Sequence, residues 1–384
     1  MSARKQHPHR FSDSEEMQPD LLEAARIAIA ESLQVRTDES VLIVTNPDPE
    51  VALISRALYD AAFAVGGRPV LVFQPVKTQM DFAEEAVIAA FGASPDVFIS
   101  VSAEKLGKDR VGIAKPYEYD GKSWNHLFHF QLYGAKTCRS FWSPGTTLDS
   151  FIRTVPIDYS VLKRRAAAIK ATLDAAVSVH ITAPSGTDVV IGLRGREAKL
   201  DDGDFSVGGR GGNLPAGETF ISPENGTASG RIVFDGSISL HDGDILIREP
   251  IVCLLEDGYI SGIEGGDEAE ALREAVALAE RNAYDYEKTG KLPTGSGAEY
   301  AKNARNIGEL GIGLNPAATI TGNMLEDEKA FRTCHFAVGH NYDEDAPALI
   351  HLDGLVVKPT ITARMGDGSE VVIEREGELE NGYR

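Results

Sequence analysis

The chain has 384 residues, of which 42% are hydrophobic and 25% are charged. These proportions are those of ordinary globular proteins, so they exclude disordered and fibrous classes. At roughly 150 residues per domain, the length predicts two or three domains, each able to bury a core. The formal net charge is -20, and so acidic a chain repels phosphate backbones and anionic lipid. We therefore expect neither a nucleic acid nor a membrane as partner.

The cysteines and the first residues bear on the cellular compartment. Cys138, Cys253 and Cys334 are too few and too scattered for a disulfide framework, and no CxxC spacing that would indicate a thiolate zinc site occurs. Residues 1–19 are polar and lack the apolar segment of a signal peptide. No apolar run approaches the ~20 residues that a membrane span needs. We expect a soluble, cytoplasmic protein in a reducing compartment.

The N-terminal part alternates helical and strand patterns. Residues 1–19 are predicted to be a disordered tail, and an amphipathic helix begins at Pro19. Further along the chain we expect strands at 41–44, 70–73 and 97–101, with helices from about residue 49 and over 82–91. Continuous apolar strands between helices are typical of a parallel sheet covered on both faces. The sequence therefore predicts an α/β domain over residues 20–157.

This domain lacks the glycine signatures of a nucleotide site. Thr45 and Asn46 follow the first strand, where a GxGxxG or GxxxxGK[ST] motif would stand. The glycine run at 208–212 follows acidic loop sequence and opens no helix, so we interpret it as a flexible or closely packed loop. A dinucleotide-dependent oxidoreductase and a P-loop enzyme are excluded on these grounds.

The second part of the chain has a different pattern of predicted secondary structure. After a predicted helix at 159–175 come short β-rich runs at 178–181, 188–193, 231–234 and 245–255, a hairpin-like segment at 255–260, and one long helix at about 268–289. Glycine turns separate most of these runs, as in antiparallel sheets. We predict an α+β domain over residues 158–384, with mainly antiparallel strands.

Histidines and isolated carboxylates concentrate in this second domain. His351 and Asp353 are two residues apart, so on a strand they project from the same face. His335 lies in a second strand-like run, while Glu309 and Glu218 are single charges among apolar and glycine residues. An imidazole with carboxylates can bind a divalent metal. A hydrogen-bonded surface pair, for His351 with Asp353, and a core histidine, for His335, are the simpler alternatives.

Two other groups have a more ordinary interpretation. His126 and His129 have metal-like spacing but aromatic neighbours, which favours a place in the core or a pocket wall. Glu326, Asp327 and Glu328 form a charge run, which is usually a solvated face or a helix start. The sequence leaves the roles of Glu326 and Glu328 open.

Five segments stand out in chain order: NLPAGETFISP, GRIVFDGSI, GELGIGLNP, TCHFAVG followed by Tyr342, and HLD. Together with N-terminal pieces from about Leu21 onward, they resemble the aminopeptidase T/S family of thermophilic-type leucyl aminopeptidases. The resemblance implies a two-domain, homodimeric metallopeptidase with a two-metal site. Carried over by position, it places metal ligands at Glu309, His335, His351 and Asp353 and a catalytic tyrosine at Tyr342. Where the family has two successive glutamates this chain has Gly217 and Glu218, so Glu218 is either the catalytic base or a metal ligand.

The segment LEDGYISGIEGGDEAEALR and the HxD motif also resemble a related family, the 2,5-dihydroxypyridine 5,6-dioxygenases. That family implies one iron held by two histidines and one carboxylate. Its first histidine falls at Glu309 and it has no counterpart of His335, so the ligand set favours the peptidases.

We therefore predict a metal-dependent aminopeptidase that removes N-terminal residues from peptides. A Zn, Co or Mn ion would activate water, with Glu218 as base and Tyr342 as hydrogen-bond donor to the oxyanion. The alternative is a mononuclear non-heme Fe(II) ring-cleaving dioxygenase that acts on a small molecule. A metal-holding protein without catalysis is a third reading. The sequence decides neither the metal, nor the number of ions, nor the side-chain preference.

Overall fold

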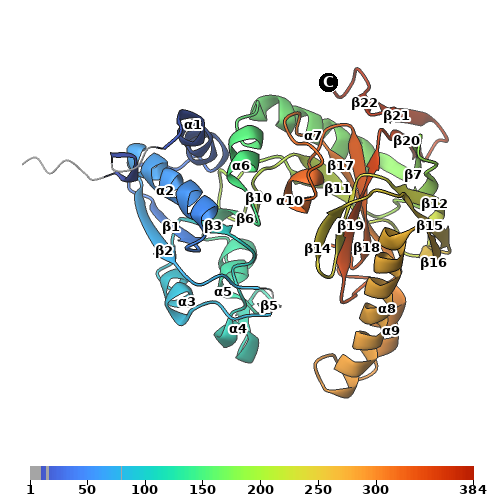
Figure 1. Ribbon diagram of the computed structural model, residues 1–384, viewed down its shortest axis with the longest axis horizontal. Coiled ribbons are helices and arrows are strands. Elements are labelled where there is room, and N and C mark those ends of the chain that lie inside the picture. The colour runs from blue at the N-terminus through green and yellow to red at the C-terminus, as the bar shows by residue number, and fades with distance from the viewer. Residues whose placement is uncertain (1–9, 14–16, 79) are drawn as a thin grey trace, which may run out of the picture. The chain divides into compact units, whose positions relative to one another are not determined.

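The computed structural model describes residues 10–13, 17–78 and 80–384 and divides the chain into two compact units (Figure 1). Unit 1 comprises Met1–Tyr159 with Gly203–Ala216, and unit 2 comprises Ser160–Asp202 with Gly217–Arg384. Most of the predicted disordered tail lies outside the described residues. Within the described part of the chain, no helix combines the length and apolar character that a membrane span requires.

Unit 1 is built on a five-stranded parallel sheet with the strand order β10-β6-β3-β1-β2. The strands are β1 (Ser40–Thr45), β2 (Arg68–Phe73), β3 (Val97–Ser102), β6 (Arg139–Pro144) and β10 (Gly211–Asn213), with a separate hairpin of β4 (Tyr117–Tyr119) and β5 (Lys122–Trp124). The helical segments are η1 (Phe11–Asp13), α1 (Pro19–Ile27), η2 (Ala28–Ser32), α2 (Pro49–Ala64), α3 (Glu85–Phe91), α4 (Arg110–Ala114), α5 (Leu127–His129), η3 (Phe130–Gly134) and α6 (Leu148–Thr154). The predicted α/β architecture of this part is confirmed.

Local sequence explains where these elements begin. The Asp48 carboxylate accepts hydrogen bonds from the backbone N–H groups of Glu50 and Val51, and Pro49 stands at the first turn, so α2 begins there. Strand β3 is buried along its whole length, as expected for a strand inside a parallel sheet.

The glycine run at 208–212 differs from the loop expected from the sequence. Its end forms β10, which pairs in parallel with β6 and extends the sheet of unit 1. A Cβ atom on Gly211 would lie 2.8 Å from the Ser140 carbonyl oxygen, so the close approach of the two strands requires glycine. Residues 203–216 consequently belong to unit 1, although they follow the first strands of unit 2 in sequence.

Unit 2 contains two antiparallel sheets. The seven-stranded sheet has the order β14-β13-β19-β18-β17-β11-β9, and the eight-stranded sheet has the order β16-β15-β12-β8-β7-β20-β21-β22. The strands of the first are β9 (Lys199–Asp201), β11 (Glu218–Ile221), β13 (Ser237–Leu240), β14 (Gly243–Leu246), β17 (Ile307–Gly313), β18 (Thr333–Gly339) and β19 (His351–Val357). Those of the second are β7 (Ala176–Thr182), β8 (Asp188–Gly192), β12 (Ser229–Phe234), β15 (Ile251–Glu256), β16 (Tyr259–Glu264), β20 (Thr360–Met365), β21 (Glu370–Arg375) and β22 (Glu378–Leu379). The helices are α7 (Tyr159–Ala175), α8 (Asp267–Lys288), α9 (Gly297–Asn303) and α10 (Met324–Asp327).

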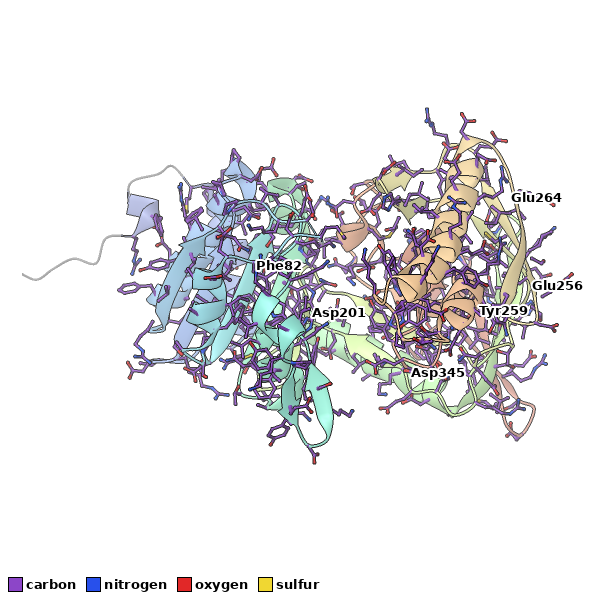
Figure 2. All side chains as sticks on the ribbon, turned by 90° about the horizontal axis from the view of Figure 1, so that it is seen from below. Phe82, Asp201, Glu256, Tyr259, Glu264 and Asp345 are labelled. Atoms are coloured by element: carbon purple, nitrogen blue, oxygen red, sulfur yellow. The ribbon has the colours of Figure 1, made fainter. Side chains whose placement is uncertain are left out.

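The expected antiparallel character of unit 2 is confirmed, with one difference. Figure 2 shows Glu256, Tyr259 and Glu264 on the hairpin of β15 and β16, whose turn residues Asp257 and Gly258 both have positive φ, at 52° and 85°. The apolar run at 245–255, however, is not one strand. It divides between β14 and β15, which belong to different sheets, and Pro250 stands between them.

The central strands β17 and β18 are buried on both faces, but the two faces differ in chemistry. Because side chains alternate along a strand, Leu310, Ile312, Phe336 and Val338 share the apolar face. Glu309 and His335 project from the opposite face. Figure 1 shows β17, β18 and β19 side by side in orange and red. The alternation of side chains along these strands therefore gives the sheet one apolar face and one buried polar face.

Removal of the Phe336 side chain tests the importance of the apolar face. Phe336 is fully buried, so Phe336→Ala is expected to lower the free energy of unfolding by about 3–5 kcal/mol. Urea denaturation measures the change. Leu254→Ala, at a 36% exposed position of β15, is the matched control and should cost less than about 1.5 kcal/mol. Equal losses for the two variants would contradict the assignment of this face to the core.

Candidate metal centre

The register of the seven-stranded sheet places acidic and imidazole side chains on one face. Glu218 pairs with Gly313 and with Asp201, His335 pairs with Gly311, and Asp353 pairs with Ala337. Directly paired residues of antiparallel strands point to the same side. Nearly every such polar residue therefore has a glycine or alanine beside it, which leaves room for the polar cluster.

Gly311 shows how tight this arrangement is. A Cβ atom at this position would lie 2.0 Å from Nε2 of His335. The imidazole therefore lies directly against the backbone of β17, and it can do so because residue 311 has no side chain.

Three of the sequence-predicted residues form the tightest group. Potential ligand atoms of Glu218, Glu309 and His335 all lie within 4.8 Å of one another. His335 Nε2 is 3.1 Å from Glu309 Oε1 and 3.3 Å from Glu218 Oε2. All three side chains are buried. Side chains from β11, β17 and β18 thus lie together, and their role as metal ligands stays a prediction.

His351 and Asp353 join this group through Glu309. His351 Nε2 lies 3.7 Å from Glu309 Oε2 and 3.4 Å from Asp353 Oδ1. Its Nδ1–H donates a hydrogen bond of 2.9 Å to the His340 carbonyl, which fixes the ring and directs Nε2 toward the carboxylates. The proposal that one ion contacts Glu309, His335, His351 and Asp353 together stays a prediction.

The carboxylates keep both imidazoles protonated in the absence of a metal. Burial alone would lower the pKa of His335, but its hydrogen bond to Glu309 and the charge of Glu218 raise the pKa to about 9. Burial also disfavours the charged form of His351, yet Asp353 raises its pKa to about 10. Burial would raise the pKa of Asp353, but His351 lowers it to about 2.

Several buried polar atoms of the cluster have no hydrogen-bond partner, as expected of side chains that bind a cation. Glu218 Oε2, Glu309 Oε2, Asp353 Oδ1 and His335 Nδ1 are buried and make no hydrogen bond. Buried polar atoms without partners are costly, and a divalent ion would satisfy the carboxylate oxygens. A mixed set of imidazole nitrogens and carboxylate oxygens suits Fe(II), Zn or Mn. The residues therefore fit a divalent metal.

A buried lysine, which the sequence analysis missed, adjoins the cluster. Lys329 Nζ lies 2.6 Å from Glu218 Oε1, 2.6 Å from Glu328 Oε1 and 3.2 Å from Asp201 Oδ2. Burial would lower the pKa of Lys329, but Glu218, Glu328 and Asp201 raise it well above the usual value. Figure 2 labels Asp201, which the sequence analysis did not single out.

The charge run from Glu326 to Glu328 is not a solvated face. Glu326 Oε1 accepts hydrogen bonds from the N–H and hydroxyl groups of Thr319, and Asp327 accepts them from Thr321 and Gly322. Both carboxylates are buried. Glu326 and Asp327 thus hold the preceding loop onto α10, while Glu328 is a partner of Lys329.

The remaining candidates lie at the edge of the cluster or outside it. The Tyr342 side chain is half exposed, and its ring centroid is 5.0 Å from that of His351 and 5.4 Å from that of Phe220. His126 and His129 line a cavity of about 510 Å³ within unit 1, and they are not part of the metal cluster.

The missing second carboxylate at position 217 has a steric explanation. Gly217 has φ of +144°, and a Cβ atom there would lie 2.6 Å from Cβ of Asn315. Both the backbone conformation and the contact exclude a glutamate at this position.

Comparison with known proteins points to one family. Residues 147–338, half of the chain, match the model of a family described as 2,5-dihydroxypyridine 5,6-dioxygenase, NicX. A Pseudomonas putida protein of that name is 32% identical over 171 residues, which span 43% of this chain and 41% of that relative's length.

Two solved structures share the fold. The 2,5-dihydroxypyridine dioxygenase of Pseudomonas putida KT2440 has a TM-score of 0.67 at 20% identity, over 95% of this chain and 98% of that one. Wild-type AmpT from Thermus thermophilus has a TM-score of 0.62 at 16% identity, over 94% and 98%. At these identities the likeness is one of fold.

These findings overturn the prediction of a metallo-aminopeptidase. The sequence matches are to the dioxygenase, which was the stated alternative, and AmpT shares the fold alone. The assignments of Glu218 as base for peptide hydrolysis and of Tyr342 as oxyanion donor belonged to that reaction, and they lose their basis with it. The expectation of a divalent metal agrees with both the family and the cluster.

Gly311→Ala tests the packing of His335 against β17. The new methyl group would displace the imidazole, so we expect metal affinity to fall at least about tenfold. Titration with Mn²⁺ measures the affinity. Gly262→Ala, whose nearest contact would be 3.5 Å, is the control and should bind normally. Unchanged affinity in Gly311→Ala would contradict a ligand role for His335.

Metal binding should release protons. At pH 7 the metal-free protein carries protons on His335 and His351, whose pKa values are about 9 and about 10, and a metal requires both rings neutral. We therefore expect release of about two protons per ion, and affinity that rises with pH and levels off above about pH 10. Calorimetry in buffers of different ionisation enthalpy measures the release. His351→Ala should release one proton fewer, and binding without proton release would contradict the ligand assignment.

Proposed function

Because the chain belongs to the 2,5-dihydroxypyridine 5,6-dioxygenase family, we propose that it is a metal-dependent dioxygenase that opens a hydroxylated pyridine ring with O₂. The observation that carries this proposal is the family match over residues 147–338, which include Glu218, Glu309 and His335. The curated relative supports it over 41% of its length.

We propose that His335, His351 and one carboxylate, Glu309 or Asp353, hold Fe(II). His335, on the strand beside Glu309, would then supply the imidazole that the resembled family has at position 309. Two imidazoles and one carboxylate are the ligand set of non-heme Fe(II) oxygenases. The ion would supply adjacent open positions for O₂ and for a ring hydroxyl of the substrate. The chain's own part is to position the ligands. The hydrogen bond to the His340 carbonyl orients His351. The burial of His335 and Glu309 keeps water away from these two side chains.

Aromatic side chains support a flat, aromatic substrate. The Tyr342 ring lies beside both Phe220 and His351, and it is half exposed. An aromatic surface next to the metal ligands can stack against a pyridine ring. We propose that Tyr342 orients the substrate by this contact.

The test is turnover of 2,5-dihydroxypyridine by protein reconstituted with Fe(II). We expect consumption of one O₂ per ring opened, with both oxygen atoms of labelled O₂ in the product and no turnover without O₂. His351→Ala should lower kcat/KM by more than about 100-fold, because it removes a metal ligand. An oxygen electrode and mass spectrometry measure these outcomes.

His180→Ala is the matched control. His180 forms a pair with Asp188 on β7 and β8 and should be dispensable. Ring opening in the absence of O₂, or full activity of His351→Ala, would contradict the proposed function.

A further inference from the structure

An ammonium group fills the space beside the metal cluster. The Lys329 side chain is completely buried, and its Nζ faces Glu218, Glu328 and Asp201 at 2.6, 2.6 and 3.2 Å. The ammonium donates hydrogen bonds to Glu218 and Glu328, and Asp201 is its third ion-pair partner. Carboxylate oxygens are also the ligands that a hard divalent cation prefers.

Glu218 connects this position to the metal cluster. Its Oε1 accepts from Lys329, while its Oε2 faces His335 at 3.3 Å and makes no hydrogen bond. Both carboxylate oxygens of Asp201 are likewise buried and make no hydrogen bond. A carboxylate with one oxygen toward each of two cations is expected where two metal ions lie about 3.5–4 Å apart. The carboxylates therefore surround two positions suited to a cation. One adjoins His335, and the Lys329 ammonium occupies the other.

We propose that the Lys329 ammonium takes the place of a second metal ion and keeps such an ion from Glu218, Glu328 and Asp201. A second ion at Glu218, Glu328 and Asp201 would have to displace a buried cation that is covalently tied to the chain. Lys329 also neutralises part of the charge of these carboxylates permanently, which an exchangeable ion would not. This inference rests on the metal centre proposed above, but not on the reaction.

The test is the number of Mn²⁺ ions bound by the full chain after chelator treatment. Electron paramagnetic resonance counts the free Mn²⁺, and no catalytic assay is involved. We expect one ion per chain for the natural protein and for Lys329→Arg, which retains the positive charge. Lys329→Ala, which opens the position, should bind two, and the pair should show the spectral coupling of neighbouring Mn²⁺ ions.

Thermal unfolding supplies a second readout. The melting temperature of the natural protein should stop rising after one equivalent of Mn²⁺, while that of Lys329→Ala should rise up to two. If Lys329→Ala does not fold, Lys329→Ala with Glu328→Gln replaces it, because this pair removes a negative charge together with the positive one. The same second equivalent is expected.

The failures are distinguishable. Two ions in the natural protein, or one in folded Lys329→Ala or in the double variant, would overturn the role of Lys329 and leave the metal centre intact. No bound ion in the natural protein would overturn the metal centre and this inference together.

Discussion

Unit 2 depends on the neutralisation of carboxylates that converge on one face of a buried sheet. Asp201, Glu218, Glu309 and Asp353 come from four different strands, and each is nearly inaccessible to solvent. Charges so buried destabilise a fold unless cations oppose them. The chain supplies these cations itself as Lys329 and the two protonated histidines. The stability of the fold and the electrostatics of the site therefore depend on the same ion pairs.

The packing of β17 and β18 also depends on which side chains share a face. Along residues 309–313 of β17 and 334–339 of β18, every second position is apolar, and the positions between them are candidate ligands, glycines or alanine. The apolar positions build the core, and the small ones leave space for the imidazole and carboxylate groups. A sheet that is buried on both faces can therefore carry a polar cluster without losing its hydrophobic support.

Sequence patterns predicted most of the architecture, because local features define it. Pro49 after Asp48, the apolar runs of β1 and β3, and the turn at Asp257 and Gly258 each act within a few residues. The HxD spacing likewise pointed to His351 and Asp353. Lys329 was missed because its partner Glu218 lies 111 residues away and its neighbours look like an ordinary surface charge run.

The function was harder to predict than the fold, for a related reason. AmpT and the dioxygenase have similar folds, at 16% and 20% identity to this chain. The residue types at the ligand positions favoured the peptidase, and they do not show which reaction a shared scaffold supports. Steric details such as the contact between Gly217 and Asn315 lie beyond any pattern in the sequence.

The return of the chain to unit 1 at Gly203–Ala216 has a practical consequence. Strand β10 covers one side of β6, and a protein truncated after the first 160 residues would leave the backbone of β6 uncovered. Exposed edge strands can pair with strands of other molecules, and this pairing leads to aggregation. A soluble fragment of this unit would have to carry the later segment grafted onto its end.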